Sequence, residues 1–316
     1  MIKRTIDISS EHVLRMRIQY DQLVVTCEGL PDRTIPAEDI GILLIDQQKT
    51  VYTHAVLVRL MQRGACVLLC DEQHLPCGLL LPLEGNELIT ERLRKQITVP
   101  RPREKRLWQQ IVRAKIGAQA ANLESPAVAS PAAEKLRALA LTVASGDPAN
   151  VEGQAARIYW PALLGRGFRR ERGGAWPNPI LNYGYMVMRA AVARAIAGAG
   201  LHPSFGVHHH NRGNAFCLAD DLLEPLRPLV DAAVCGILDT TPNAEEPPQV
   251  TPRVKTMLLS LLARDVQLAG QSGPLMVQLH RMTASLWGCY AGERDTLELP
   301  TYNVEDLFVP PENADD

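Results

Sequence analysis

The sequence contains no Cys-x-x-Cys pair, although it has seven cysteines in 316 residues. An odd and scattered set of cysteines argues against a disulfide framework and a structural zinc site, and it favours a reducing environment. The first ten residues, MIKRTIDISS, contain no apolar core of a signal peptide, and no run of about 18 apolar residues follows them. These absences predict a cytoplasmic protein without a membrane partner.

Charge is nearly balanced overall but uneven along the chain. The formal net charge of −2 argues against a surface that is positive throughout, yet residues 91–115 carry nine Lys or Arg against two Glu, a local net charge of +7. Residues 293–316 carry eight acids against one Arg, a net charge of −7. Such an acidic end is typical of a solvated tail, and the alternatives are docking on a basic groove or binding of a partner.

Residues 1–88 predict a small, mostly-β domain. Short apolar or alternating runs between turn residues are typical of strands, and the continuous apolar run 40–45 suits a strand that is covered on both faces. Apolar spacing over 51–63 predicts one helix, which Gly64 ends. The other predicted strands are 5–9, 13–18, 22–27, 66–70 and 78–83.

Strand patterns nearly vanish after residue 88, where we place a basic linker, 89–102. Helical spacing then predicts an all-α domain over 103–292, followed by the acidic tail 293–316. The predicted fold class is therefore α+β, with a small mostly-β N-terminal domain before a larger all-α C-terminal domain. Asp147 and Pro148 fit the cap and the first residue of one helix. The predicted helices are 106–123, 132–145, 148–164, 181–198, 222–235, 253–268 and 275–288, and 238–249 is a predicted loop.

Histidines and acids gather between residues 206 and 231. The triplet 208–210 is followed by Asp220, Asp221 and Glu224, and imidazoles with clustered carboxylates are typical ligands of a divalent cation. Asp221 and Glu224 also match a capping box, which Pro225 supports, and the histidines alone would equally fit a polar loop. We interpret Glu224 as the ligand and Asp221 as a cap or a supporting acid.

A second set of candidates lies around the predicted helix 148–164. Glu152 stands among small residues, although a lone helical glutamate is normally exposed on the surface. Basic residues interleaved with Tyr159, Trp160, Phe168 and Trp176 suit a phosphate backbone and unstacked bases, and an ordinary solvated surface is the alternative. The candidates for DNA binding are Arg157, Arg166, Arg169, Arg170 and Arg172, together with Arg101, Arg103 and Lys105 of the earlier basic run.

Several stretches closely resemble the spacer-acquisition integrases of CRISPR systems, the universal metal-dependent DNA endonucleases of CRISPR adaptation. The match is best to the type II-like branch, found with single-protein effectors. The motifs occur in the family's order within residues 150–232, and the mostly-β domain before helices fits the family as well. The matching segments are 152–157, 178–185, 193–196, 198–203, 206–209 and 221–228.

The resemblance implies that Glu152, His209 and Glu224 hold Mg²⁺ or Mn²⁺, with His208, Asp220 and Asp221 as further candidates. It implies attack of a DNA 3′-hydroxyl on a phosphodiester of the CRISPR array, and double-stranded and branched DNA as partners. It also implies a homodimer joined through the β domain. A small second universal adaptation protein would join two dimers in a heterohexamer, and the RNA-guided effector nuclease is a further candidate partner.

Two other functions fit parts of the sequence. A non-catalytic DNA-binding scaffold would keep the basic residues, with the acids serving as caps and surface charges. A metallohydrolase of small phosphate substrates would keep the acids and histidines, but it would not need positive charge over so many residues. The presence of Glu152, His209 and Glu224 together favours the integrase.

Overall fold

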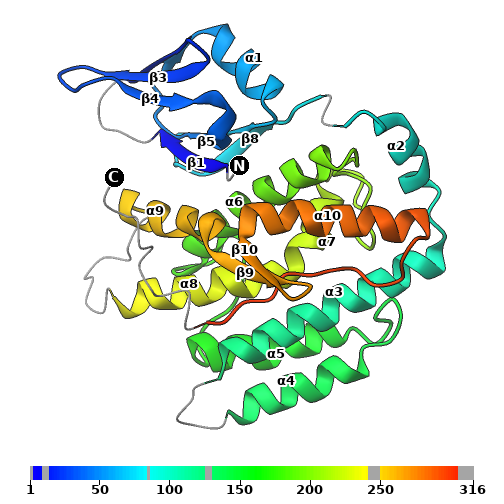
Figure 1. The fold of residues 1–316 in the computed structure, drawn as a ribbon. Helices are drawn as coiled ribbons and strands as arrows, with labels where there is room; N and C mark the ends of the chain where they lie inside the picture. Colours follow the sequence, from blue (N-terminus) through cyan, green and yellow to red (C-terminus); the bar gives the residue numbers. More distant parts are fainter. Residues whose placement is uncertain (1–2, 9–13, 84–85, 125–129, 241–249, 305–316) are drawn as a thin grey trace.

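The structure is a computed structural model, and it describes residues 3–8, 14–83, 86–124, 130–240 and 250–304. A strand-rich part lies on one side of a larger, mostly helical part (Figure 1). This arrangement confirms the predicted α+β class. None of the helices in the described ranges is long and apolar enough to cross a membrane.

The N-terminal part is built from two four-stranded sheets and one helix. In the first sheet β1, β5 and β7 run parallel and β8 is antiparallel to β7; in the second, β4, β3 and β2 are antiparallel and β6 is parallel to β2. The elements are β1 (Arg4–Ile8), β2 (Leu14–Gln19), β3 (Gln22–Cys27), β4 (Arg33–Pro36), the 3₁₀ turn η1 (Ala37–Asp39), β5 (Ile40–Ile45), β6 (Val51–Tyr52), α1 (His54–Gln62), β7 (Cys66–Cys70) and β8 (Pro76–Leu80).

Strand β5 explains the continuous apolar run at 40–45. All six of its residues are buried, because the sheet has a hydrophobic layer on each face. Leu43 and Ile45 belong to the core between the two sheets, whereas Ile42 and Leu44 belong to the core shared with the helices. The predicted doubly covered strand is thus confirmed, and it fastens the first sheet to the helical part.

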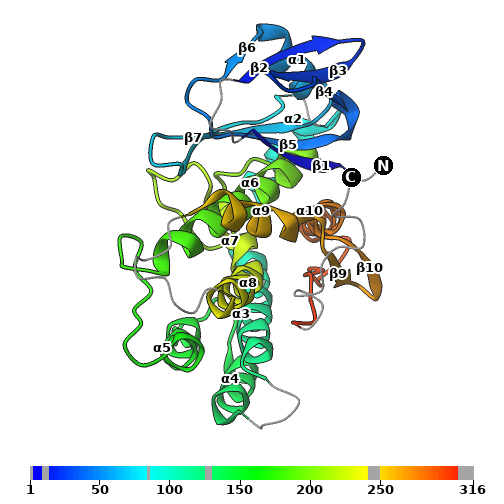
Figure 2. The same cartoon turned by 90° about the vertical axis from the view of Figure 1, so that its left-hand side faces the viewer.

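The helical part is organised around α6, which is buried along most of its length beneath the first sheet (Figure 2). Helices α3, α4 and α5 form a layer at the end far from the sheets. The helices are α2 (Ile89–Ile97), α3 (Arg101–Asn122), α4 (Pro131–Thr142), α5 (Val151–Leu164), α6 (Asn178–Gly198), α7 (Cys217–Leu223), α8 (Arg227–Asp239), α9 (Pro252–Ser260) and α10 (Leu275–Ala291), with 3₁₀ turns η2 (Glu224–Leu226) and η3 (Leu261–Ala263).

A β-hairpin interrupts the helices where the sequence predicted a helix over 253–268. Helix α9 ends at Ser260, and β9 (Asp265–Leu268) pairs with β10 (Gln271–Pro274). Ala269 and Gly270 connect the strands, both with positive φ, as a tight hairpin turn requires. The long helix was wrong because β9 alternates exposed and buried residues with the period of a strand.

The start of α5 also differs from the prediction. Asn150, in a left-handed conformation, is the N-cap, so the helix begins three residues after Pro148. Asp147 still stabilises the N-terminus of α5, because its carboxylate accepts hydrogen bonds from the N–H groups of Val151 and Glu152 at 2.8 and 3.1 Å. The acid therefore satisfies two of the helix's unpaired donors from outside the helix.

The stretch that we predicted as a basic linker contains α2. Gln96 of this helix is buried and donates hydrogen bonds to the carbonyls of His202 and Phe205 at 2.9 and 3.1 Å. Arg92 donates to the carbonyl of Ala199 at 2.7 Å. These bonds tie α2 to the loop that follows α6.

The first part of the acidic tail is docked rather than solvated. Leu297 is buried, and Thr301 pairs with Gln267 of β9. For residues 293–304 the interpretation as a solvated tail is therefore wrong, whereas 305–316 lie outside the described residues. The predicted loop 238–249 begins inside α8, and 241–249 are likewise outside the described residues.

Candidate metal centre and nucleic-acid surface

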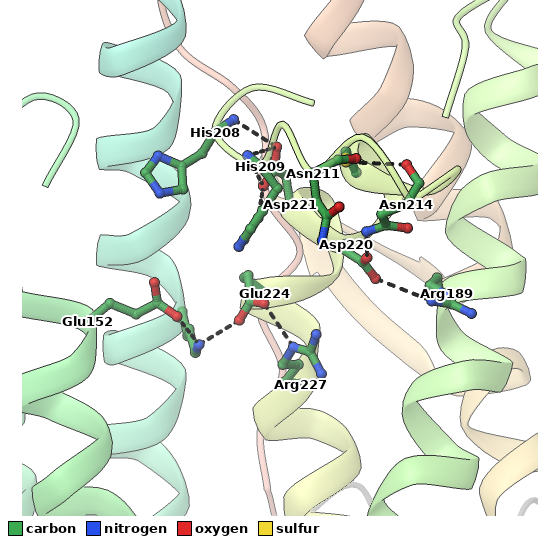
Figure 3. A network of polar contacts seen from close by, with 12 residues as sticks. Glu152, Arg189, His208, His209, Asn211, Asn214, Asp220, Asp221, Glu224 and Arg227 are labelled. Atoms are coloured by element: carbon green, nitrogen blue, oxygen red, sulfur yellow. Dashed lines mark hydrogen bonds and ion pairs between the residues drawn. The ribbon is translucent and has the colours of Figure 1, made fainter. Parts of the chain in front are cut away.

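Three separated segments bring Glu152, His209 and Glu224 to one place (Figure 3). Glu152 lies in the first turn of α5, Glu224 begins η2, and His209 belongs to the loop between α6 and α7. Lys115 of α3 donates from Nζ to Glu152 Oε1 and to Glu224 Oε2, each at 2.5 Å. Among the described residues no three His, Cys, Asp or Glu side chains are placed to hold a metal ion. The Lys115 ammonium instead bridges the two carboxylates.

Glu224 is held in its charged form although it is almost fully buried. Burial alone would raise its pKa, but the positive charges of Arg227 and Lys115 outweigh burial and lower the pKa to about 2. Arg227 donates from Nε to the second carboxylate oxygen at 2.9 Å. For Lys115, burial would lower the pKa, and Glu224 and Glu152 reverse the effect, so that its pKa is raised. Glu224 and Lys115 are therefore both ionised at neutral pH.

Asp221 orients the His209 ring. This buried carboxylate accepts from His209 Nδ1 at 2.5 Å and from the backbone N–H of His208 at 2.8 Å. Its hydrogen bond raises the pKa of His209 against the effect of burial. Because Nδ1–H donates to Asp221, the neutral ring keeps a free lone pair on Nε2.

Gly206 makes this arrangement possible. A Cβ atom there would lie 2.4 Å from the carbonyl oxygen of His209 and 2.8 Å from Asp221 Oδ2. Glycine is therefore required at position 206 for a steric reason: any side chain there would keep the Asp221 carboxylate from the N–H groups of the loop. Asp221 lies inside α7 and binds this loop, so its interpretation as a helix cap is wrong, and it is the supporting acid.

The other candidates of the histidine segment have different partners. The His208 ring stacks on Trp108, with 4.1 Å between ring centroids, and burial lowers its pKa. His210 Nε2 accepts from Arg101 at 2.9 Å. Asp220 accepts from Asn214 Nδ2 at 2.7 Å. These three side chains therefore do not join the contact between Glu152, Lys115 and Glu224.

A cavity of about 520 Å³ opens beside His209 and Glu224. The guanidinium groups of Arg170 and Arg227 lie over the Tyr185 ring, 5.1 and 4.7 Å from its centroid. Two further arginines, Arg172 and Arg189, also line the cavity. Planar guanidinium groups on one wall, next to paired carboxylates, are suited to hold a phosphodiester.

The predicted DNA-binding residues divide into exposed and internally bonded groups. Arg103 donates to the carbonyl of Cys289 at 2.9 Å, and Arg170 donates to Asn178 and Asn182 at 2.9 and 2.7 Å. Arg101 forms an ion pair with Glu104 at 3.2 Å, but its side chain is exposed. The remaining candidates, which are Arg157, Arg166, Arg169, Arg172 and Lys105, are exposed.

The aromatic residues between these arginines do not form a row for stacking bases. Tyr159 is fully buried, and the Trp160 and Phe168 rings pack on each other with 5.4 Å between centroids. Tyr159 instead donates a hydrogen bond to Asp231 at 3.0 Å. The proposed base-stacking role is therefore wrong for Tyr159, whose ring belongs to the core.

Asp231 and Lys115, two buried charged residues near this site, were missed in the sequence. Asp231 accepts hydrogen bonds from Tyr159 and Tyr185, and burial raises its pKa to about 6. Lys115 was counted only as one of the basic residues of 91–115, yet it follows the buried Ile111 by four residues. The helical period could have placed it on the buried face of α3.

Comparisons with known proteins agree on one family. The family model described as CRISPR associated protein Cas1 matches residues 9–248. The chain is 37% identical to the CRISPR-associated endonuclease Cas1 of Neisseria meningitidis serogroup C (strain 8013) over 271 residues, covering 86% of this chain and 87% of that protein. This similarity agrees with the predicted type II-like branch.

Solved structures show the same fold at low identity. A casposase bound to integration product superposes with a TM-score of 0.76 at 19% identity, covering 96% of this chain and 95% of that one. A chain of a Cas6-RT-Cas1–Cas2 complex superposes with a TM-score of 0.73 at 17% identity, covering 95% of this chain and 36% of that one. With the family model matching most of its length, the chain belongs to the Cas1 family of CRISPR-associated endonucleases and integrases.

Proposed function

We propose that this chain is a metal-dependent DNA endonuclease and integrase of spacer acquisition. It inserts short foreign DNA segments into the CRISPR array by attack of a 3′-hydroxyl on a phosphodiester. One observation carries the proposal: Glu152 and Glu224, from separate elements, converge on a single cation, and His209 lines the same cavity as Glu224. In the structure that cation is the Lys115 ammonium, and in the active protein it is a divalent metal ion.

The donor set supports Mg²⁺ or Mn²⁺ held by Glu152, His209 and Glu224. Two carboxylates that already share one cation supply oxygen ligands, and His209 has its free Nε2 because Asp221 binds Nδ1. An imidazole in the set favours Mn²⁺ more than an all-oxygen site would. When bound, the metal ion would neutralise charge on the phosphate and stabilise the leaving oxygen.

The surrounding side chains bind and orient the DNA. Among the arginines that line the adjoining cavity, the exposed Arg172 offers its guanidinium to a phosphodiester, and Arg227 holds Glu224 in place. The exposed Arg157, Arg166 and Arg169 extend the positive surface along the backbone of a longer duplex. This part of the binding energy falls steeply with salt concentration.

The same proposal includes the assembly. The chain acts as a homodimer joined through its β-rich domain, and the small second adaptation protein joins two dimers in a heterohexamer. A structural neighbour that is part of a Cas1–Cas2 complex supports this choice of partner. The RNA-guided effector nuclease is proposed as a further partner.

Strand transfer tests the proposal against a non-catalytic scaffold. The wild-type protein is incubated with branched DNA in Mn²⁺ or in EDTA, beside Glu152→Ala and the control Glu134→Ala, which changes an exposed glutamate of α4. We expect product only with Mn²⁺, none from Glu152→Ala, and unchanged elution of that variant in gel filtration. No product from the wild type would support the scaffold instead. Product in EDTA, or full activity of Glu152→Ala, would refute the proposed metal-dependent mechanism.

A further inference from the structure

Lys115 is a charged residue in the middle of a buried helix face. It follows the buried Ile111 and Val112 and precedes the buried Ile116 in α3, and its side chain is 11% exposed. Its stem passes through this apolar layer, so that the ammonium emerges between α5 and η2. The sequence placed Lys115 in a DNA-binding run, but the structure directs it at two carboxylates.

The two contacts of Lys115 use the same oxygens that a metal ion would need. Its Nζ lies 2.5 Å from Glu152 Oε1 and 2.5 Å from Glu224 Oε2. A Mg²⁺ ion binds carboxylate oxygens at roughly 2.1 Å. An ion bound to both oxygens would therefore occupy the space of the ammonium, and two cations at this separation would repel each other strongly. The ammonium and the metal ion exclude each other from this position.

The charges around the pair are balanced while Lys115 is in place. Glu152 and Glu224 contribute two negative charges, and Lys115 and Arg227 contribute two positive charges. Arg227 contacts only Glu224 in this group, through its other carboxylate oxygen, so it does not bridge the carboxylates. Without Lys115, a buried carboxylate on η2 would face a second one on α5 with no charge between them. Such a pair is unfavourable unless a cation separates it.

We propose that the Lys115 ammonium is a built-in counter-ion of the metal site, which holds Glu152 and Glu224 together in the metal-free protein and is displaced from between them by the divalent cation. The inference rests on the proposed metal site. Lys115 is thus a positioning residue, and its competition with the metal ion weakens metal binding. The long, flexible lysine stem allows the ammonium to leave without a change in the backbone.

Calorimetric titration of the full chain with Mn²⁺ tests the competition. The variant is Lys115→Met, which keeps the apolar stem and removes the charge; the control is Lys135→Met, at an exposed position of α4. We expect Lys115→Met to bind Mn²⁺ roughly tenfold or more tightly than the wild type, since a neighbouring positive charge is lost. We also expect its melting temperature to be lower than that of the wild type in EDTA and to rise more on addition of Mn²⁺. The control matches the wild type in both measurements.

The outcomes separate the two proposals. If the wild type binds Mn²⁺ and Lys115→Met binds it equally or more weakly, the counter-ion role is refuted while the metal site stands. If neither protein binds Mn²⁺, the proposed metal site itself is refuted.

A measurement on the wild type remains decisive if Lys115→Met does not fold. Reductive methylation followed by mass spectrometry reports how accessible each lysine amine is. We expect Lys115 to be protected in EDTA and to be methylated faster in Mn²⁺, with Lys135 methylated at the same rate in both. Equal protection of Lys115 with and without Mn²⁺, at a concentration that saturates the site, would overturn displacement.

Discussion

Replacing the buried Asp231 with asparagine should stabilise the protein, and more so at higher pH. Asp231 is buried in α8 between Tyr159 and Tyr185, and burial raises its pKa from 3.8 to about 6. The unfolded chain therefore loses this proton at lower pH than the folded one. Ionisation of this carboxylate therefore lowers the free energy of unfolding. The loss begins near pH 3.8 and reaches its full extent above pH 6.

The magnitude follows from the difference between the two pKa values. Each pKa unit corresponds to about 1.4 kcal/mol, so the cost of Asp231 is about 1.6 kcal/mol at pH 5 and about 3 kcal/mol at pH 8. Asparagine keeps the shape, and its amide oxygen accepts from one tyrosine hydroxyl while its amide nitrogen donates to the other. It carries no proton to lose in this pH range. Asp231→Asn should therefore raise the free energy of unfolding by an amount that is about 1.4 kcal/mol larger at pH 8 than at pH 5.

Urea denaturation at pH 5 and pH 8 measures this difference. Asp239→Asn, at the exposed end of the same helix, is the matched control and should change stability little at either pH. An Asp231→Asn variant that is less stable than the wild type at pH 8 would refute the reasoning. An equal gain at both pH values would also refute it, because it would mean that no proton is linked to folding at this site.

Two further variants test the support of the site and its attachment to the sheets. Asp221→Asn should weaken Mn²⁺ binding by roughly 10- to 100-fold in calorimetric titration, because it loosens the bond that orients His209, and unchanged affinity would contradict that role. Lys255→Met should lower the free energy of unfolding by about 3–5 kcal/mol in urea, because it removes the buried ammonium that contacts Asp46 Oδ2 and leaves this buried carboxylate only its contact with His74. A loss below about 1 kcal/mol would mean that this contact between α9 and the strand-rich part is not important for stability.

The sequence predicted the elements whose hydrophobic period is regular. The covered strand 40–45 and the helix over 181–198 follow directly from apolar spacing, and both are present, the helix beginning three residues earlier. The hairpin at 265–274 was missed because its two strands are only four residues long. Such short strands give a weak pattern of alternation next to a preceding helix.

Within the site, sequence reasoning identified residue types better than their partners. It named Glu152, His209 and Glu224 but not Lys115, which bridges the two glutamates in the structure. It could not decide whether Asp221 is a helix cap or a supporting acid, because the spacing of Asp221 and Glu224 in the sequence fits both roles. The structure distinguishes the two, because Asp221 lies inside α7 and accepts hydrogen bonds from the loop, where Gly206 leaves room for its carboxylate.

The charges that were missed share a physical reason. Pattern analysis assigns charged residues to the surface, because burying an unpaired charge is costly. Lys115 breaks that rule because two carboxylates from other segments compensate it, and a compensating partner so distant in sequence leaves no local signal. A site that must hold a cation near a phosphate needs such clustered charge away from water. Charged residues at core-facing helix positions are therefore the places where sequence reasoning about burial fails and where a search for function should begin.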